Sequence, residues 1–299
     1  MPYRGRFAPS PTGELHFGSL LAALASCLEA RSRGGEWLVR MEDVDAPRVV
    51  AGAAGSMLAC LEAHGFVWDG ETLWQSRRLD AYRAALDELR ARGLAYGCAC
   101  SRKEIAMSAK TRAIDGGLLY SGKCRHGTPS GRPPRAWRLR VENADIAFDD
   151  PIQGRVSQNL ARDVGDFVLL RADGQFAYQL AVVVDDAFQG ITHVARGADL
   201  LDSTPRQIYL QRCLGYAAPD YLHVPVATNM AGEKLSKQTG AKALNLNPPA
   251  ANLTRALGFL GQCPPQELAR ASVGAVWEWA LENWKREAIP RCRGLRTED

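Results

Sequence analysis

Near its amino terminus the chain reads Arg6-Phe7-Ala8-Pro9-Ser10-Pro11-Thr12-Gly13-Glu14-Leu15-His16-Phe17-Gly18-Ser19. A short extended stretch at residues 4–8 leads into this turn-rich segment, and a helical repeat of apolar residues at 17–33 follows it. A second strand is expected at residues 37–41, after a pair of glycines that ends the helix. Strand, helix and strand with short connections predict a parallel α/β sheet, in which ligands bind at the carboxyl ends of the strands.

The rest of the chain continues this alternation, interrupts it and then resumes it. Residues 97–134 are rich in Gly, Ser, Arg and Cys and lack periodicity, which indicates an insertion into the sheet domain. We expect helices at 51–64, 80–92, 178–188 and 203–214, β segments at 136–150, 167–171 and 191–196, and mostly helices after residue 240.

The bulk composition is that of an ordinary globular protein. The 299 residues are 46% hydrophobic and 23% charged, and no apolar run is long enough to cross a bilayer. The amino terminus lacks the apolar segment of a secretory signal, so we expect a cytoplasmic protein. The net charge of +4 permits a nucleic-acid partner without requiring one.

A second informative segment lies far along the chain and reads Gly232-Glu233-Lys234-Leu235-Ser236-Lys237-Gln238. Two ammonium groups and a hydroxyl in one loop can neutralise the charge that develops as pyrophosphate leaves a triphosphate. In the first segment, His16 can donate to a phosphate and Gly18 lets a flat nucleotide approach the backbone. Taken singly, each segment is also compatible with a plain capping turn or a solvated loop. A P-loop is excluded, since no Gly-x4-Gly-Lys-Ser/Thr is present.

Together the two segments resemble the paired signatures of class I aminoacyl-tRNA synthetases, with Ser19 in place of the usual final His of the first signature. The stretches 6–13 and 39–43 are similar to the glutamyl and glutaminyl group of that class. The resemblance implies that His16, Lys234, Ser236 and Lys237 are catalytic, and that ATP is bound by His16, Gly18, Ser19 and Lys237. It implies a glutamate site made of Arg6, Phe7, Ala8, Pro9, Ser10, Glu42, Tyr178 and Arg196.

The chemistry of these residue types fits glutamate. Arg6 can form a bidentate pair with a carboxylate, and Glu42, at the end of the second strand, can hold an α-ammonium group. A structural ion pair is the competing interpretation for each of them. An arginine in contact with the side-chain carboxylate would favour glutamate over glutamine, because an unpaired buried partner costs roughly 2–5 kcal/mol.

Three of the eight cysteines cluster in the expected insertion, at Cys98, Cys100 and Cys124. Three thiolates and one further ligand make a structural zinc site. Side-chain chemistry alone favours His126 as the fourth ligand, whereas the resemblance implies Tyr120. The competing interpretation is three reduced thiols without metal.

Only 62 residues follow Lys237, too few for the large anticodon-binding region of a full-length glutamyl-tRNA synthetase. The resemblance therefore narrows to truncated paralogues that activate L-glutamate with ATP and Mg²⁺ without tRNA. These enzymes transfer glutamate to the queuosine base in the anticodon of tRNA(Asp). A short glutamyl-tRNA synthetase acting on tRNA(Glu) and a non-catalytic RNA-binding paralogue are the alternatives.

This resemblance implies an α/β fold with a Rossmann-like parallel sheet. We expect a first catalytic half at 1–95, an inserted zinc-containing α+β subdomain at 96–165, a second catalytic half at 166–240 and a small helical subdomain at 241–299. We further expect a monomer, with an RNA stem held by basic residues of the insertion, namely Arg125, Arg132, Arg135 and Arg138.

Overall fold

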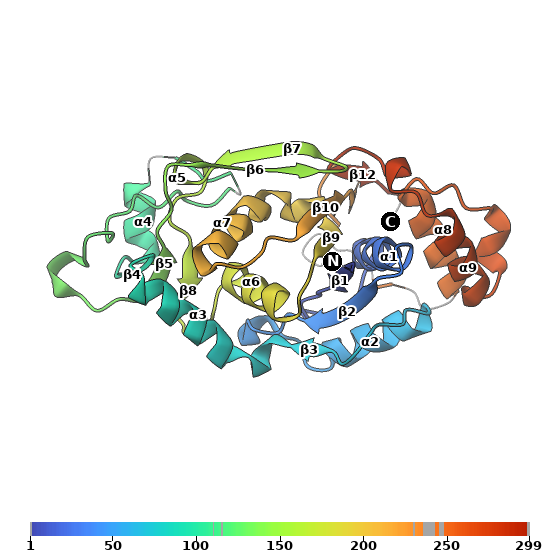
Figure 1. The fold of residues 1–299 in the computed structure, drawn as a ribbon, viewed down its shortest axis with the longest axis horizontal. Helices are drawn as coiled ribbons and strands as arrows, with labels where there is room; N and C mark the ends of the chain where they lie inside the picture. Colours follow the sequence, from blue (N-terminus) through green and yellow to red (C-terminus); the bar gives the residue numbers. More distant parts are fainter. Residues whose placement is uncertain are drawn as a thin grey trace.

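The computed structural model describes residues 2–109, 111–114, 116–229, 231–235, 243–244 and 248–297. The molecule is elongated, with parallel strands and their helices at its centre (Figure 1). The insertion lies at one end, around β4, α4 and β5, and the carboxyl-terminal helices α8 and α9 lie at the other (Figure 1). In the described part of the chain, no helix has both the length and the apolar character needed to cross a bilayer.

The central strands are all parallel. β1 (Arg4–Phe7) pairs with β2 (Glu36–Met41), which pairs with β3 (Leu73–Trp74). β9 (His193–Gly197) pairs with β10 (Asp220–Val224) and lies beside β1, where the Thr192 amide donates to the Arg4 carbonyl at 3.0 Å. The strands therefore lie in the order β3-β2-β1-β9-β10, which confirms the predicted class of parallel α/β fold.

Helices follow the strands and cover them. They are α1 (Phe17–Arg31), α2 (Ala53–Ala63), α3 (Leu79–Ala91), α6 (Tyr178–Phe188) and α7 (Thr204–Leu214). α1 is buried along most of its length, and Leu20, Leu24 and Leu28 are at most 1% exposed. Such a helix lies in the interior of the molecule rather than on its surface, because both of its faces are apolar. It packs between β9 and the carboxyl-terminal helix α8.

The insertion is mostly antiparallel. β4 (Ala95–Cys98), β5 (Ala136–Leu139) and β8 (Val168–Leu170) form one sheet, and β6 (Asp145–Asp150) and β7 (Gly154–Asn159) form a hairpin. Two short helices, α4 (Arg102–Ser108) and α5 (Leu160–Asp163), complete it. The hairpin runs along the upper edge of Figure 1, from α5 towards β12, so that it bridges the insertion and the central strands.

The carboxyl-terminal segment contains α8 (Pro249–Phe259) and α9 (Val273–Asn283) and ends in a strand. This last strand, β12 (Gly294–Arg296), pairs in parallel with β11 (Val226–Thr228). The 3-10 helices of the described chain are η1 (Ala46–Arg48), η2 (Gln75–Arg77), η3 (Pro129–Gly131), η4 (Ala198–Ser203), η6 (Gln266–Arg270) and η7 (Arg286–Ala288).

The helices expected from the sequence at 17–33, 51–64, 80–92, 178–188 and 203–214 are all present, with ends shifted by at most two residues. The expected strands at 37–41 and 191–196 correspond to β2 and β9. Strands β3, β4, β7, β10, β11 and β12 were not expected. The division into four segments stays a prediction.

Candidate active site

A cavity of about 730 Å³ opens at the carboxyl ends of β1, β2, β9 and β10. This is the edge at which doubly wound sheets bind their ligands. Every predicted catalytic, ATP-binding or glutamate-binding residue that the structure describes lines it, namely Arg6, Phe7, Ala8, Pro9, Ser10, His16, Gly18, Ser19, Glu42, Tyr178, Arg196 and Lys234. Ser236 and Lys237 lie outside the described residues. The structure thus brings together groups up to 228 positions apart in the sequence, from Arg6 to Lys234, although their individual roles stay predictions.

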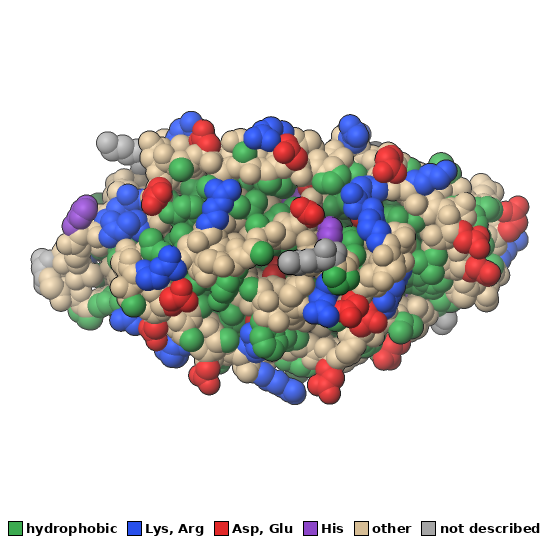
Figure 2. All heavy atoms as spheres, viewed as in Figure 1, with side chains coloured by type: hydrophobic (Ala, Val, Ile, Leu, Met, Phe, Trp, Pro, Cys, Tyr) green, Lys and Arg blue, Asp and Glu red, His purple; other side chains and the backbone are tan. Residues whose placement is uncertain are grey.

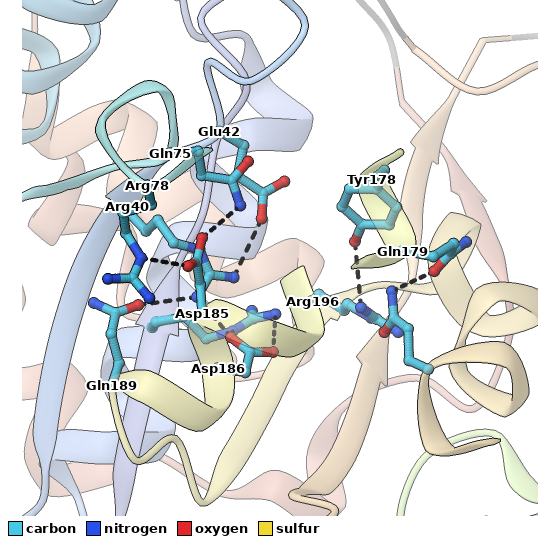
Figure 3. Close-up of polar contacts among 12 residues, drawn as sticks. Arg40, Glu42, Gln75, Arg78, Tyr178, Gln179, Asp185, Asp186, Gln189 and Arg196 are labelled. Carbon is cyan, nitrogen blue, oxygen red and sulfur yellow. Dashed lines mark hydrogen bonds and ion pairs between the residues drawn. The ribbon is translucent and has the colours of Figure 1, made fainter. Parts of the chain in front are cut away.

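One wall of the cavity is a buried network of two arginines and two carboxylates (Figure 3). Asp186, on α6, accepts from Arg6 Nε at 3.0 Å and from Arg40 Nη1 at 2.7 Å. Arg40, on β2, also donates from Nη2 to Glu42 Oε1 at 3.2 Å. Two positive and two negative charges balance in this network, so their burial does not leave an uncompensated charge.

The two carboxyl groups of the network have pKa values shifted in opposite directions. Burial raises the pKa of Glu42, and the nearby Arg40 and Arg6 only partly oppose that effect. Burial alone would also raise the pKa of Asp186, but Arg6 and Arg40 outweigh it and lower that pKa. Asp186 is therefore the permanent anion of the network, whereas Glu42 would gain most from an additional cation such as an ammonium group.

Arg6 does not face the cavity with its whole guanidinium group. Its Nε and Nη2 both donate to Asp186, at 3.0 and 3.4 Å, so that one edge is held by a protein carboxylate. The sequence-based expectation of a bidentate pair therefore applies first to Asp186. A substrate carboxylate would approach the remaining N–H groups of an arginine whose plane is already fixed.

The opposite wall contains Tyr178 and Arg196, which point toward one another in Figure 3. Arg196 Nη1 donates to Tyr178 Oη at 3.4 Å, and Arg196 Nη2 donates to Thr204 Oγ1 at 2.7 Å. Arg196 Nε donates to His223 Nε2 at 3.1 Å. Burial raises the pKa of Tyr178, so this side chain remains a neutral phenol.

The first loop presents the amino end of α1 to the cavity. His16 is the cap residue of this helix, and its Nδ1 accepts from the Ser19 amide at 3.3 Å. In a neutral ring, Nε2 then carries the proton and is the atom suited to donate to a phosphate. A side chain at Gly18 would approach the His16 ring to about 3.1 Å, so glycine keeps this corner open.

The lysine-bearing loop reaches the same cavity from β11. The Leu235 amide donates to the Ala227 carbonyl at 2.8 Å, which fixes the start of the loop. Lys234 Nζ donates to a carboxylate oxygen of Asp199, directly after β9. This contact holds the ammonium group at the lining of the cavity.

The three clustered cysteines converge in the insertion, with their Sγ atoms within 4.8 Å of one another. The Sγ atoms of Cys100 and Cys124 are 3.6 Å apart, close to the ~3.8 Å that two thiolates on one tetrahedral zinc ion would show. Tyr120 Oη lies 3.3 Å from Cys98 Sγ and 3.7 Å from Cys100 Sγ. His126 is exposed and is not part of the group. The donor set therefore fits a zinc ion, with Tyr120 rather than His126 placed as its fourth side chain.

The basic residues of the insertion are largely engaged within the protein. Arg125 pairs with Asp166 at 2.5 Å, Arg132 pairs with Glu104 at 3.0 Å, and Arg138 is buried over the Tyr120 ring. On the face drawn in Figure 2, positive and negative side chains are interspersed. These three arginines therefore have structural roles, which weakens the expectation that they hold an RNA stem.

Sequence reasoning missed three buried groups that organise the cavity, which are Asp186, Asp150 and His223. A signal existed for Asp186, because two adjacent carboxylates end the apolar run at 180–184 and such groups need buried partners. No comparable signal marks Asp150 or His223, since their pairing depends on β10, a strand that the sequence pattern did not reveal.

Comparisons with known proteins agree with this arrangement. Residues 3–249 match the family model for the catalytic domain of class I tRNA synthetases (E and Q, that is, the glutamate and glutamine enzymes). The chain is 66% identical to a glutamyl-Q tRNA(Asp) synthetase of Dechloromonas aromatica, over 97% of this chain and 96% of that protein. It is 59% identical to the protein of the same name from Chromobacterium violaceum, over 96% and 95% of the two chains.

A solved glutamate tRNA ligase from Elizabethkingia meningosepticum, in complex with its amino acid, superimposes with a TM-score of 0.80. The identity is 25%, and the match covers 99% of this chain and 67% of that one. The chain therefore belongs to the glutamate and glutamine branch of class I tRNA synthetases and, within it, to the family of glutamyl-Q tRNA(Asp) synthetases.

Proposed function

We propose that this protein activates L-glutamate with ATP in the absence of tRNA and then transfers the glutamyl group to the queuosine base in the anticodon of tRNA(Asp). The observation that carries the proposal is the convergence of Arg6, Glu42, Arg196, His16 and Lys234 on one cavity. Its volume of about 730 Å³ is within the ordinary range for a site that holds a nucleotide-sized ligand.

The signs of the lining groups support glutamate as the amino acid. Glu42, Arg6 and Arg196 all line the cavity, and in this proposal Glu42 attracts the ammonium group while the two arginines attract carboxylates. Glutamate offers one ammonium group and two carboxylates, and glutamine would leave an arginine facing an amide.

In the first step, an oxygen of the glutamate α-carboxylate attacks the α-phosphorus of ATP. A P–O bond forms, the bond to the β-phosphate oxygen breaks, and pyrophosphate leaves with its electron pair. Mg²⁺ bound with ATP would neutralise part of the phosphate charge. The residues of this chain hold the reactants, with His16 and Lys234 beside the phosphates and Arg6 and Glu42 beside the amino acid.

In the second step, a hydroxyl of the queuosine cyclopentenediol attacks the carbonyl carbon of the mixed anhydride. An ester bond forms, AMP leaves, and the hydroxyl proton passes to solvent or to a leaving oxygen. This acceptor is favoured over the 3′ end of tRNA(Glu) by the similarity to the two relatives described above, both of which are called glutamyl-Q tRNA(Asp) synthetase.

Labelled glutamate tests the acceptor. We expect label on queuosine-containing tRNA(Asp), whether or not its 3′-terminal adenosine has been removed, and none on tRNA(Asp) that lacks queuosine. Label that requires the terminal adenosine, or that appears on tRNA(Glu), would assign the protein to the short glutamyl-tRNA synthetases instead.

We further propose that the insertion holds one structural zinc ion at Cys98, Cys100, Tyr120 and Cys124. The mutual approach of the three sulfur atoms supports it. The ion would fix the loop of residues 98–124 to β4, and it takes no part in the two chemical steps. The monomeric state and the cytoplasmic location expected from the sequence stay predictions.

A further inference from the structure

A chain of buried hydrogen bonds runs from the β6–β7 hairpin to the cavity. Asp150, the last residue of β6, lies 2.7 Å from His223 Nδ1, measured from its Oδ2 atom. His223 lies on β10, and its Nε2 is 3.1 Å from Arg196 Nε and 3.1 Å from Thr204 Oγ1. The side chains of Asp150 and His223 are both fully buried, so solvent does not compete for these contacts.

The donors and acceptors fix the state of the imidazole ring. Arg196 Nε can only donate, so His223 Nε2 must accept and cannot carry a proton. An ionised Asp150 can only accept, so His223 Nδ1 must carry the proton. Arg196 thus excludes a proton on Nε2 and Asp150 requires one on Nδ1, and together they give the neutral tautomer with hydrogen on Nδ1.

An imidazolium ring would not fit this position. It would place an N–H on Nε2 against the N–H of the Arg196 guanidinium group. Burial lowers the pKa of His223 to about 4, with Arg196 acting in the same direction and the hydrogen bond to Asp150 acting against it. The ring is therefore neutral at physiological pH.

Arg196 depends on these neutral groups for its orientation. Among the described residues, its guanidinium group has hydrogen-bond partners on His223, Thr204, Tyr178 and the Leu200 carbonyl, and it makes no ion pair. It differs in this respect from Arg6, whose charge Asp186 already balances. The charge of Arg196 thus remains available to a substrate anion, provided that its plane is held.

We propose that Asp150 and His223 are positioning residues for Arg196. Asp150 sets the tautomer of His223, and the Nε2 lone pair of His223 then fixes the Nε edge of Arg196 so that the opposite edge faces the amino acid in the cavity. The inference rests on the proposed function, because Arg196 is a glutamate contact only if the cavity binds glutamate.

The substitution Asp150→Asn tests this with almost no change in shape. Asp150 Oδ1 accepts from the amides of Ile152 and Gln153, both at 2.9 Å. These two donors would keep the oxygen of an asparagine, which turns its NH₂ group toward His223 Nδ1. The ring would then shift its proton to Nε2 and oppose Arg196 with a donor. The same tautomer logic explains the large loss in a serine protease when its buried aspartate becomes asparagine.

Two measurements test whether Asp150 and His223 position Arg196. Nitrogen NMR of histidine-labelled protein should show His223 as the Nδ1–H tautomer in the wild type and as the Nε2–H tautomer in Asp150→Asn. Glutamate-dependent ATP–pyrophosphate exchange should show a KM for glutamate raised roughly 10- to 100-fold, with the KM for ATP changed less than about twofold. Asp149→Asn is the matched control, since Asp149 precedes Asp150 on the same strand and is exposed in a pair with Arg155.

A second variant separates positioning from packing. In His223→Gln an amide oxygen can still accept from Arg196, and no tautomer is available for residue 150 to control. We therefore expect the double variant Asp150→Asn/His223→Gln to match His223→Gln in its glutamate KM within about threefold, so that the Asp150→Asn effect largely disappears.

The inference is overturned if wild-type His223 carries its proton on Nε2, or if Asp150→Asn shifts the tautomer without raising the glutamate KM. It is also overturned if the two single effects multiply in the double variant. Failure of the proposed function would be visible separately, as a wild-type protein that gives no exchange with glutamate. The tautomer and the Arg196 Nε–H resonance would then still show whether the hydrogen-bonded chain orients Arg196.

Discussion

Arg6 and Arg40 share the carboxylate of Asp186, and this sharing determines how the cavity wall presents charge. Arg40 is fully buried, and its Nη1 and Nη2 atoms donate to Asp186 and Glu42, so it supports the wall of the site from behind. Arg6 is tied to the same carboxylate but lines the cavity. Of these two neighbouring cations, Arg6 is therefore the one that can act on a ligand.

Arg6→Ala should nearly abolish glutamate-dependent pyrophosphate exchange. The change removes a cation that lines the cavity and that, in the proposed function, faces the amino acid. It leaves Asp186 with Arg40 as its remaining ion-pair partner among the described residues. Loss of such a charged contact costs about 2–5 kcal/mol, which is a rise of roughly 30- to 5000-fold in the glutamate KM. Arg4→Ala is the matched control, because Arg4 lies on the same strand in a half-exposed pair with Glu36. Exchange with an ordinary glutamate KM in Arg6→Ala would contradict the assignment.

His223 should make the folded protein sensitive to acid. Burial lowers its pKa to about 4 from an ordinary value of 6.5, so between these values the unfolded chain binds a proton that the folded chain does not. Stability is therefore lost as the pH falls below 6.5, by roughly 2 kcal/mol from this group at pH 5. Burial also lowers the pKa values of His64 and His193, so they act with the same sign.

Urea unfolding at pH 7 and pH 5 measures this effect. We expect the free energy of unfolding to fall in acid, and to fall less in His223→Gln than in the wild type. Equal losses in the two proteins would show that His223 does not titrate below its ordinary range.

At the scale of elements, the insertion should hold the proposed zinc ion through its three clustered cysteines. Cys124→Ser removes one of three converging thiolates, so we expect a fall from about one zinc per chain to a small fraction of that value. Elemental analysis of protein purified without chelators provides the measurement. Cys263→Ser serves as the control, because Cys263 is exposed and lies outside the cluster. Wild-type protein without zinc would rule out the proposed site.

The carboxyl-terminal segment is attached to α1 through Glu29, a fully buried carboxylate. Arg286 donates to it at 2.5 Å, Trp284 Nε1 at 2.8 Å, and Arg33 at 3.0 Å. Arg286→Ala should destabilise the protein by about 1–3 kcal/mol, less than for a lone buried pair because Arg33 remains. The midpoint of urea unfolding measures this, with the exposed Arg291→Ala as control. An unchanged midpoint would mean that this attachment does not stabilise the fold.

The helices were predictable from the sequence because each carries enough periodic apolar residues to define a face. The strands were less predictable than the helices. β10 reads Asp-Tyr-Leu-His-Val and buries the histidine at its fourth position, so its sequence pattern does not indicate a core strand. β12 pairs with β11, which lies 66 to 70 positions earlier in the chain, and such long-range pairing leaves no local signal in the sequence.

At the scale of the whole molecule, the loops around the cavity were predictable from the sequence. The buried side chains that hold Arg6 and Arg196 in place were not. The segments that hold His16 and Lys234 carry recognisable signatures, because phosphate chemistry restricts their residue types. The groups that orient Arg6 and Arg196 come from α6, β6 and β10. Their carboxylate and imidazole side chains are common in any sequence, and only the folded arrangement shows which of them meet.

The central claim is that one cavity binds glutamate and ATP together and joins them without RNA. ATP–pyrophosphate exchange measured with purified protein and no tRNA tests it most directly. We predict exchange that depends on glutamate and is not supported by glutamine or aspartate at comparable concentrations. Exchange that appears only after tRNA is added, or that glutamine supports equally well, would contradict it.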